Sequence, residues 1–559
     1  MQKAVILVVF LMLLPNFVGG VVGEPEEFHD TYRFYLKFES ENRIEGDMEL
    51  DYTNKADVPL DSIYFNIYPN AYKDRGGYLQ INEMCDENGL LNYEIFGKNE
   101  TLVEVKLREA LKPGESISVK MRFEIGVARF EPYTEKRGLF GMMGTDLTMR
   151  FSQNNGTYYL GNTLPIVCVY DGKWHNNDYF TGESFHSEFA NYDVTLDLPA
   201  EFKACTSGYL IDENVENDRR ILYYTSDLLR EFTIVFSNTF EILSEEWNGK
   251  TINIFYPKGK LETAKACMIG TEKVLEKFSV EFGEYSYKEF NVIEHPRIAM
   301  EFPCLVMVPF VEVYEKGWEV ERGEGLSHEI SHQWWYAAVG NNENDEPWLD
   351  EAFAVYSNTL FNEWEYGERS KKVGSGYLKY LKDKGKDAPV GGDVWSFTCE
   401  GYATIVYNKG AAVLNMLRYV VGDENFFEIL REYYEEYKFK LVTTYDFIGI
   451  CEKVYGEDLD WFFDEWVYGT GCLDYKGEAK VEERDGKYLL NITIKQRSEF
   501  KMILDLEIVY ENGKEEYKRV WINDTTESFE YLCDSKPISL TLDPSYWLLG
   551  VMERSVKIK

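Results

Sequence analysis

Histidine is scarce in this chain, which contains six in 559 residues. Two of them nevertheless stand four residues apart in SHEISHQWW, residues 327–335, with a glutamate directly after the first. With so few histidines, such a pairing rarely arises by chance. The motif therefore raises the question of a metal site, and other parts of the chain must supply the missing ligand and the missing chemistry.

The chain has no C-x-x-C pair among its nine cysteines. This excludes a cysteine-zinc site and a disulfide framework, and the odd count leaves at least one thiol unpaired within a monomer. Basic residues are also few, 59 against 97 acidic ones, so the formal net charge is −38. Such a charge argues against binding of nucleic acid or anionic membrane surfaces, and it favours neutral or cationic substrates.

Long apolar runs are absent beyond the N-terminus, so we expect no stable membrane insertion of the mature chain. The N-terminus has one lysine, an apolar run over residues 4–14 and then small residues, which predicts a signal peptide over residues 1–23, cut after Gly23. The alternative is an uncleaved anchor, because residues 4–22 are just long enough to span a bilayer. Either way we expect an exported protein, secreted or held at the cell surface.

The length predicts more than one domain, and the hydrophobic pattern changes twice along the chain. Period-two runs such as TYRFYLKF and ISVKMRFEIG predict an N-terminal antiparallel β domain over residues 24–240. Helical periodicity, as in LSHEISHQWWYAAVG, mixed with a strand-like stretch predicts a mixed α/β domain over residues 241–473. Strands return over residues 474–559 and predict a C-terminal β-sandwich with DG and NG hairpin turns. The expected fold class is multidomain α+β.

The histidine pair fits a metal site if it lies on a helix. His328 and His332 then face the same side and can reach one ion, while Glu329 can point at a water molecule on that ion. The spacing alone also fits core histidines held by hydrogen bonds. A third ligand follows in PWLDEAFAVY, a helix opened by Pro347, where Glu351 is separated from His332 by eighteen residues. Because an acid among apolar neighbours costs energy unless it is paired or coordinated, we expect coordination. Two histidines and a carboxylate leave one position for water, as in catalytic zinc sites.

The motif HEISHQWW…PWLDEAFA resembles the zinc signature of the M1 aminopeptidases, HExxHxW followed after eighteen residues by a glutamate. Four more segments resemble motifs of that family: IAMEFP at 298–303, GYATIVYNKGA at 401–411, DLDWFFDEWVYGTG at 458–471 and FNIYPNAY at 65–72. The resemblance implies a thermolysin-like fold for the mixed domain. It also implies one Zn²⁺ per chain, held by His328, His332 and Glu351.

The resemblance implies roles for the other motif residues as well. Glu329 would be the general base that takes a proton from the zinc-activated water and passes it to the leaving amine. Tyr407 would donate its hydroxyl to the oxyanion of the intermediate. Glu301 would hold the free α-amino group of the substrate, and the backbone of Ala299 and Met300 would line the peptide like an edge strand. The expected reaction is release of N-terminal residues from peptides, with a neutral or basic N-terminus preferred.

The sequence departs from the family pattern in three places. Ile298 replaces the glycine and Phe302 the asparagine of the family's G-A-M-E-N motif, which removes backbone freedom and a polar side chain that could brace the loop. The second amine-binding residue of the family has Gln153 as its candidate here. The helical C-terminal domain of larger members has no counterpart, so we expect a more open cleft. Two alternatives therefore stay open: a zinc endopeptidase of loose specificity, and a non-catalytic zinc-bearing surface or binding protein.

Overall fold

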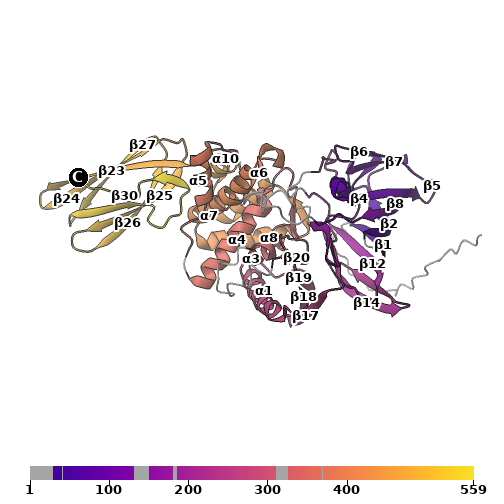
Figure 1. Ribbon diagram of the computed structural model, residues 1–559. Helices are drawn as coiled ribbons and strands as arrows, with labels where there is room; N and C mark the ends of the chain where they lie inside the picture. Colours follow the sequence, from indigo (N-terminus) through magenta and orange to yellow (C-terminus); the bar gives the residue numbers. More distant parts are fainter. Residues whose placement is uncertain (1–28, 41, 131–149, 180–184, 310–324, 368) are drawn as a thin grey trace, which may run out of the picture.

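The computed structural model describes residues 29–40, 42–130, 150–179, 185–309, 325–367 and 369–559. The predicted signal peptide lies outside these ranges. Within them, no helix is both long enough and apolar enough to cross a membrane. The chain forms a β-rich part, a helical part and a second β-rich part, which lie in a row in sequence order (Figure 1).

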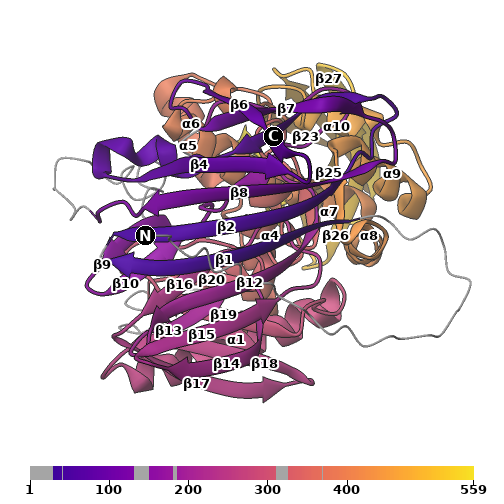
Figure 2. The same ribbon diagram turned by 90° about the vertical axis from the view of Figure 1, so that its right-hand side faces the viewer.

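The N-terminal part is built around an eight-stranded sheet, whose broad face is turned toward the viewer in Figure 2. In strand β2 every second side chain is buried, because alternate residues of a strand point to opposite faces. Pairing among the described strands of this sheet is antiparallel except between β1 and β12, which run parallel. The strand order is β14 (Tyr209–Glu216), β15 (Arg219–Thr225), β12 (Ala190–Pro199), β1 (Asp30–Ser40), β2 (Arg43–Thr53), β8 (Ser116–Gly126), β4 (Tyr78–Asp86) and β5 (Gly89–Leu90).

Two smaller sheets complete the N-terminal part. FNIYPNAY is extended only to Asn66, and a 3₁₀ helix, η1 (Tyr68–Arg75), follows with Pro69 in its first turn. One sheet has the order β13 (Lys203–Thr206), β16 (Ile234–Ser237), β10 (Thr157–Leu160) and β9 (Phe151–Asn154). The other has the order β11 (Ile166–Val167), β3 (Leu60–Asn66), β7 (Leu102–Leu111) and β6 (Asn92–Phe96).

The middle part combines one four-stranded mixed sheet with a set of helices. The sheet has the order β17 (Phe240–Trp247), β18 (Lys250–Pro257), β19 (Glu289–Glu294) and β20 (Leu305–Val308). The longer helices are α1 (Leu261–Glu281), α4 (Trp348–Tyr366), α5 (Ser375–Lys384), α7 (Gly410–Val421), α8 (Asp423–Tyr437) and α9 (Thr444–Tyr455). The short elements are α3 (Leu326–Ser331), β21 (Val339–Asn341), η4 (Val394–Ser396), α6 (Cys399–Tyr402), the π-helix η5 (Ala403–Lys409), β22 (Lys440–Val442) and α10 (Asp460–Trp466).

The C-terminal part consists of two four-stranded sheets packed face to face. Gly477 on β23 shows how closely they approach, because an added Cβ would lie 2.6 Å from Val556 of the other sheet. Trp547 joins this part to the helices: the Arg369 guanidinium lies 3.8 Å from its ring, and its carbonyl accepts a 2.8 Å hydrogen bond from Asn415 on α7. The sheets are β27 (Thr526–Cys533), β24 (Lys487–Gln496), β23 (Leu473–Arg484), β29 (Gly550–Met552), and β26 (Glu515–Ile522), β25 (Met502–Tyr510), β28 (Pro537–Leu542), β30 (Ser555–Val556).

Candidate metal centre

The histidine pair lies on α3, which is shorter than the sequence predicted. The helix ends at Ser331, and His332 caps it in a still helical conformation, with φ −61° and ψ −13°. One helical turn therefore separates the two histidines, and their Nε2 atoms lie 3.2 Å apart. Because the predicted spacing needs only this one turn, the early end of the helix leaves the pair intact.

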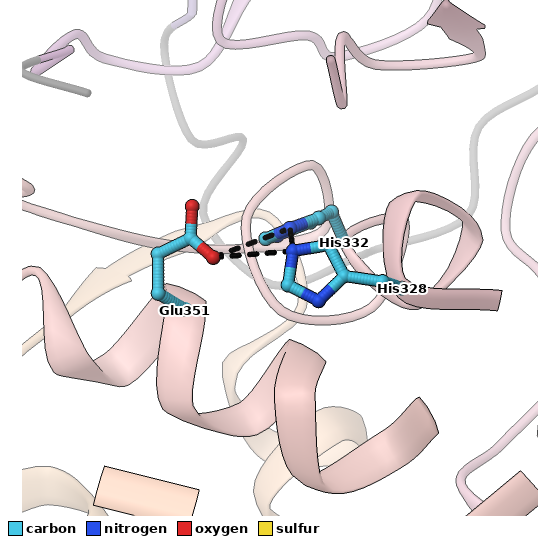
Figure 3. Close-up of side chains that lie close together, drawn as sticks. All are labelled: His328, His332 and Glu351. Carbon is cyan, nitrogen blue, oxygen red and sulfur yellow. Dashed lines mark hydrogen bonds and ion pairs between the residues drawn. The ribbon is translucent and has the colours of Figure 1, made fainter. Parts of the chain in front are cut away.

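Helix α4 brings the third predicted ligand to the same point. The Glu351 Oε2 atom lies 3.2 Å from Nε2 of His328 and 3.9 Å from Nε2 of His332 (Figure 3). The Trp335 indole N–H donates a 3.0 Å hydrogen bond to Ser357 on α4, which ties the end of the histidine segment to this helix. Side chains from two segments of the chain thus converge, as their spacing predicted.

Asp350, which the sequence reasoning overlooked, orients one of the histidines. Its carboxylate is within hydrogen-bonding reach of His332 Nδ1, and both side chains are fully buried. A proton on Nδ1 leaves the lone pair of Nε2 directed at the other two ligands. The signal for Asp350 in the sequence is its position directly before Glu351 in LDEAF.

The donor set fits zinc. Ligand atoms around a tetrahedral zinc ion lie roughly 3.3–3.6 Å from one another, given metal–ligand distances of about 2.0–2.2 Å. The three separations found here, 3.2, 3.2 and 3.9 Å, are close to that range. Burial and the neighbouring His332 ring lower the pKa of His328 well below its usual value, so its imidazole is neutral, the form that binds metal.

Two further carboxylates border the ligands. One oxygen each of Glu301 and Glu329 and one ring nitrogen of His332 lie within 4.8 Å of one another. One carboxylate oxygen each of Glu301, Asp350 and Glu351 also lie within 4.8 Å of one another. Both Glu301 and Glu329 are buried, at 6% and 5% exposed. The structure therefore brings the predicted general base and the predicted amine-binding acid to the candidate metal centre.

Tyr407 approaches the centre from the π-helix η5. Its ring is nearly parallel to that of His328, at 12°, with the ring centres 6.2 Å apart. The π-helix, a rare form that often occurs at functional sites, lies between α6 and α7. Lys409 of the same motif is buried, and its Nζ atom lies 3.3 Å from the Asp387 carboxylate. The motif thus combines a tyrosine beside a ligand with a buried ion pair.

The segment around Glu301 runs along strand β20. Met300 exchanges both backbone hydrogen bonds with Met307, at 3.0 and 2.9 Å. Because neighbouring residues of a paired strand point their backbone groups in opposite directions, those of Ala299 and Glu301 point away from β20. Of the two residues predicted to line a peptide by their backbone, Ala299 therefore offers the outward edge, and Met300 is engaged with the sheet.

The N-terminal part contacts this segment from β9 and β10. Gln153 lies on β9, paired with Tyr158. Phe130, whose N–H donates to the Gln153 carbonyl, packs against His295 at 6.5 Å between ring centres, and the Tyr159 ring at the end of β10 packs against the same histidine at 4.5 Å. A Cβ added to Gly161 would lie 2.3 Å from the Phe302 ring, so the glycine lets that ring fit closely. The phenylalanine that replaces the family's asparagine is therefore packed against the N-terminal part.

Known proteins resemble the part of the chain that carries this geometry. Residues 260–466 match the Peptidase family M1 domain. Probable aminopeptidase 2 of Sulfurisphaera tokodaii is 22% identical over 301 residues, covering 50% of this chain and 38% of that protein. Aminopeptidase M1 of Arabidopsis thaliana is 23% identical over 318 residues, covering 53% and 36%. The matches thus span less than two fifths of these relatives' length.

Solved structures share the fold. An M1 zinc metallopeptidase from Deinococcus radiodurans superimposes with a TM-score of 0.57 at 20% identity, covering 79% of this chain and 93% of that one. Legionella pneumophila aminopeptidase A, solved in complex with aspartic acid, gives a TM-score of 0.67 at 14% identity, covering 95% and 60%. The candidate site thus combines an HExxH motif with a glutamate from a second helix, on a fold shared with solved M1 metallopeptidases. The match to the Peptidase family M1 domain covers residues 260–466, which include the histidine pair, Glu351 and Tyr407.

Proposed function

We propose that the protein is a zinc-dependent aminopeptidase that releases N-terminal residues from peptides. The observation that carries the proposal is the position of Glu301, whose carboxylate lies within 4.8 Å of Glu329 and His332. Cleavage within a peptide needs the metal and the general base, but it needs no acid beside them. A buried carboxylate at this point gives a free α-ammonium group an ion-pair partner next to the scissile bond.

The metal is one zinc ion per chain, held by His328, His332 and Glu351. When bound, zinc supplies Lewis acidity that polarises a peptide carbonyl and makes a water molecule acidic near neutral pH. Glu329 removes a proton from the attacking water and returns it to the departing amine. Since the Glu329 side chain is buried, it acts with little competition from bulk water.

Two further side chains complete the proposed mechanism. Tyr407 donates its hydroxyl to the oxygen of the scissile carbonyl as negative charge develops there. Glu301 holds the α-ammonium group, which sets how many residues lie between the N-terminus and the bond that is cut. One residue fits between them because the Glu301 carboxylate lies so close to the ligands.

The proposed substrates are peptides with a neutral or basic N-terminal residue. The formal net charge of −38 supports this preference, because it attracts cations and repels anions. A variant of the Deinococcus radiodurans metallopeptidase has been solved with the tripeptide substrate Tyr-Ser-Ala. We further propose export, on the strength of the predicted signal peptide alone.

A panel of fluorogenic aminoacyl and peptidyl substrates tests the proposal, each compound used free and N-acetylated, with and without a chelator. We expect turnover of the free compounds only, loss of turnover with the chelator and recovery on adding Zn²⁺. Equal cleavage of the acetylated compounds would instead favour the endopeptidase. Stoichiometric zinc without turnover of any compound would favour the non-catalytic zinc-binding protein.

A further inference from the structure

The backbone turn that follows Glu301 adopts a conformation that its sequence does not favour. The Phe302 carbonyl accepts a 3.0 Å hydrogen bond from the Leu305 N–H, with Pro303 second and Cys304 third in the turn. Cys304 has φ +59°, the left-handed region that type II turns require at this position and that glycine or asparagine usually occupies. For a residue with a Cβ atom this conformation is strained. Something outside the turn must therefore hold it.

Gln333, the residue after the ligand His332, contacts this turn with both ends of its amide. Its Oε1 atom accepts a 2.8 Å hydrogen bond from the Cys304 N–H. Its Nε2 atom donates a 3.2 Å hydrogen bond to the Phe302 carbonyl. The side chain is 1% exposed, so water does not compete for these groups.

The two contacts link the metal-ligand segment to the segment that carries Glu301. Glu301 is flanked by Met300, whose backbone is paired with Met307, and by Phe302, whose ring packs against Gly161. The turn is thus fixed to β20 on one side and to the N-terminal part on another. Of these contacts, only the hydrogen bonds of Gln333 come from a residue next to a candidate metal ligand. A shift of the turn would move the Glu301 carboxylate relative to the metal centre.

We propose that Gln333 is a positioning residue that sets the distance between the Glu301 carboxylate and the metal, and so determines how strongly a free α-ammonium group is bound. The inference rests on the proposed aminopeptidase function. These two hydrogen bonds brace the turn in which Phe302 stands where the resembled motif has asparagine.

The test measures the contribution of the amine to binding. The probes are a zinc-binding aminoacyl hydroxamate, matched to the best substrate of the panel, and its desamino analogue. In the wild-type zinc enzyme we expect the amine to strengthen inhibition roughly ten- to a hundredfold, as for a hydrogen bond between charged groups. The quantity compared is the ratio of the inhibition constant of the desamino analogue to that of the aminoacyl hydroxamate. In Gln333→Met, which keeps the side-chain length but loses both hydrogen bonds, we expect this ratio to fall about tenfold. The desamino analogue should bind within about twofold of its affinity for wild type.

Two more variants separate positioning from a general structural role. Gln333→Glu keeps the acceptor for the Cys304 N–H, so its ratio should lie between those of wild type and Gln333→Met. Cys304→Gly removes the strain that Gln333 offsets, because glycine adopts positive φ readily. Added to Gln333→Met, it should restore most of the lost ratio.

Two measurements distinguish the outcomes: the ratio of the two inhibition constants and the zinc content of each variant. An unchanged ratio in both Gln333 variants overturns the inference, and so does an equal weakening of both hydroxamates with loss of zinc. Failure of Cys304→Gly to restore the ratio overturns the role of the turn. If the wild-type enzyme shows no amine contribution and cleaves acetylated substrates, the proposed aminopeptidase function itself fails. That outcome is seen before any variant is made.

Discussion

Replacing Glu329 should lower the catalytic rate without loss of zinc, whereas replacing a metal ligand should release the zinc. In the proposed mechanism the ligands hold the ion, whereas Glu329 moves protons. In Glu329→Gln we expect kcat to fall by about 10²–10⁴-fold, with zinc still bound at one equivalent. Activity assays and elemental analysis of the same preparation measure both quantities. Glu428→Gln, on the exposed face of α8, is the matched control and should retain activity. Undiminished turnover in Glu329→Gln would contradict the mechanism.

In the proposed zinc site Asp350 acts on the metal through its contact with His332. Because its carboxylate fixes which ring nitrogen carries the proton, Asp350→Asn should weaken zinc binding about 10- to 100-fold while leaving all three ligands in place. Competition with a chelator of known affinity measures the dissociation constant. Asp423→Asn, a change of the same kind at an exposed position, should leave zinc affinity unaltered. Equal affinities in wild type and Asp350→Asn would show that the contact with His332 has no effect on the metal.

At the level of single residues, the sequence predicted the candidate metal ligands but not the side chains that position them. His328, His332 and Glu351 could be predicted because one helical turn and one helix start fix their geometry locally. Asp350 and Gln333 could not, since only the tertiary structure decides which acid of LDEAF meets the His332 ring and which backbone groups the Gln333 amide meets. Side chains that position other side chains leave no spacing pattern in a sequence.

For whole elements, the sequence predicted α4, the helix that carries Glu351, but not the short elements around the site. The apolar run WWYAAVG predicted a continued helix, but the chain turns, and β21 pairs in parallel with β22 of a distant segment. A segment buried on all sides has no polar face, so its periodicity cannot separate helix from strand. The π-helix that carries Tyr407 was likewise not predicted, because no side-chain pattern distinguishes it from an α-helix.

The π-helix is anchored by the buried pair of Lys409 and Asp387. The same carboxylate also accepts a 2.7 Å hydrogen bond from Tyr377 and one from the Gly471 N–H, next to the C-terminal part. Removing one partner of a buried pair leaves the other charge uncompensated, so Lys409→Met should lower the free energy of unfolding by about 3–5 kcal/mol. Urea denaturation measures the change. Lys384→Met, which breaks an exposed pair with Glu400, should change it by less than about 1 kcal/mol. Equal effects of the two changes would exclude this anchoring.

At the scale of the whole molecule, a buried acid joins the N-terminal part to the segment after the metal ligands. Glu231 accepts a hydrogen bond of 2.5 Å from Asn162 and another from the Tyr336 hydroxyl, which follows the ligand segment. Arg150 and Arg230 also face it, and Arg230 in turn pairs with Glu343 at 3.3 Å. Burial raises the pKa of Glu231 to about 7, against the opposing effects of Tyr336 and the two arginines. The junction therefore contains a carboxyl group that titrates near neutral pH.

This raised pKa makes the stability of the folded chain depend on pH. The folded state holds the Glu231 proton more tightly than the unfolded chain, so the contribution of this group is complete below about pH 4.5. It declines as the pH rises to about 7 and is constant above that. The total is roughly 3 kcal/mol. Glu231→Gln, which cannot ionise, should therefore lose less stability than wild type between pH 5 and pH 8, as measured by urea denaturation at each pH. Glu284→Gln, at an exposed position, should follow the wild-type pH dependence. The same decline in Glu231→Gln as in wild type would show that this carboxyl does not titrate in the folded chain. The pH dependence would then have to arise from groups outside the junction.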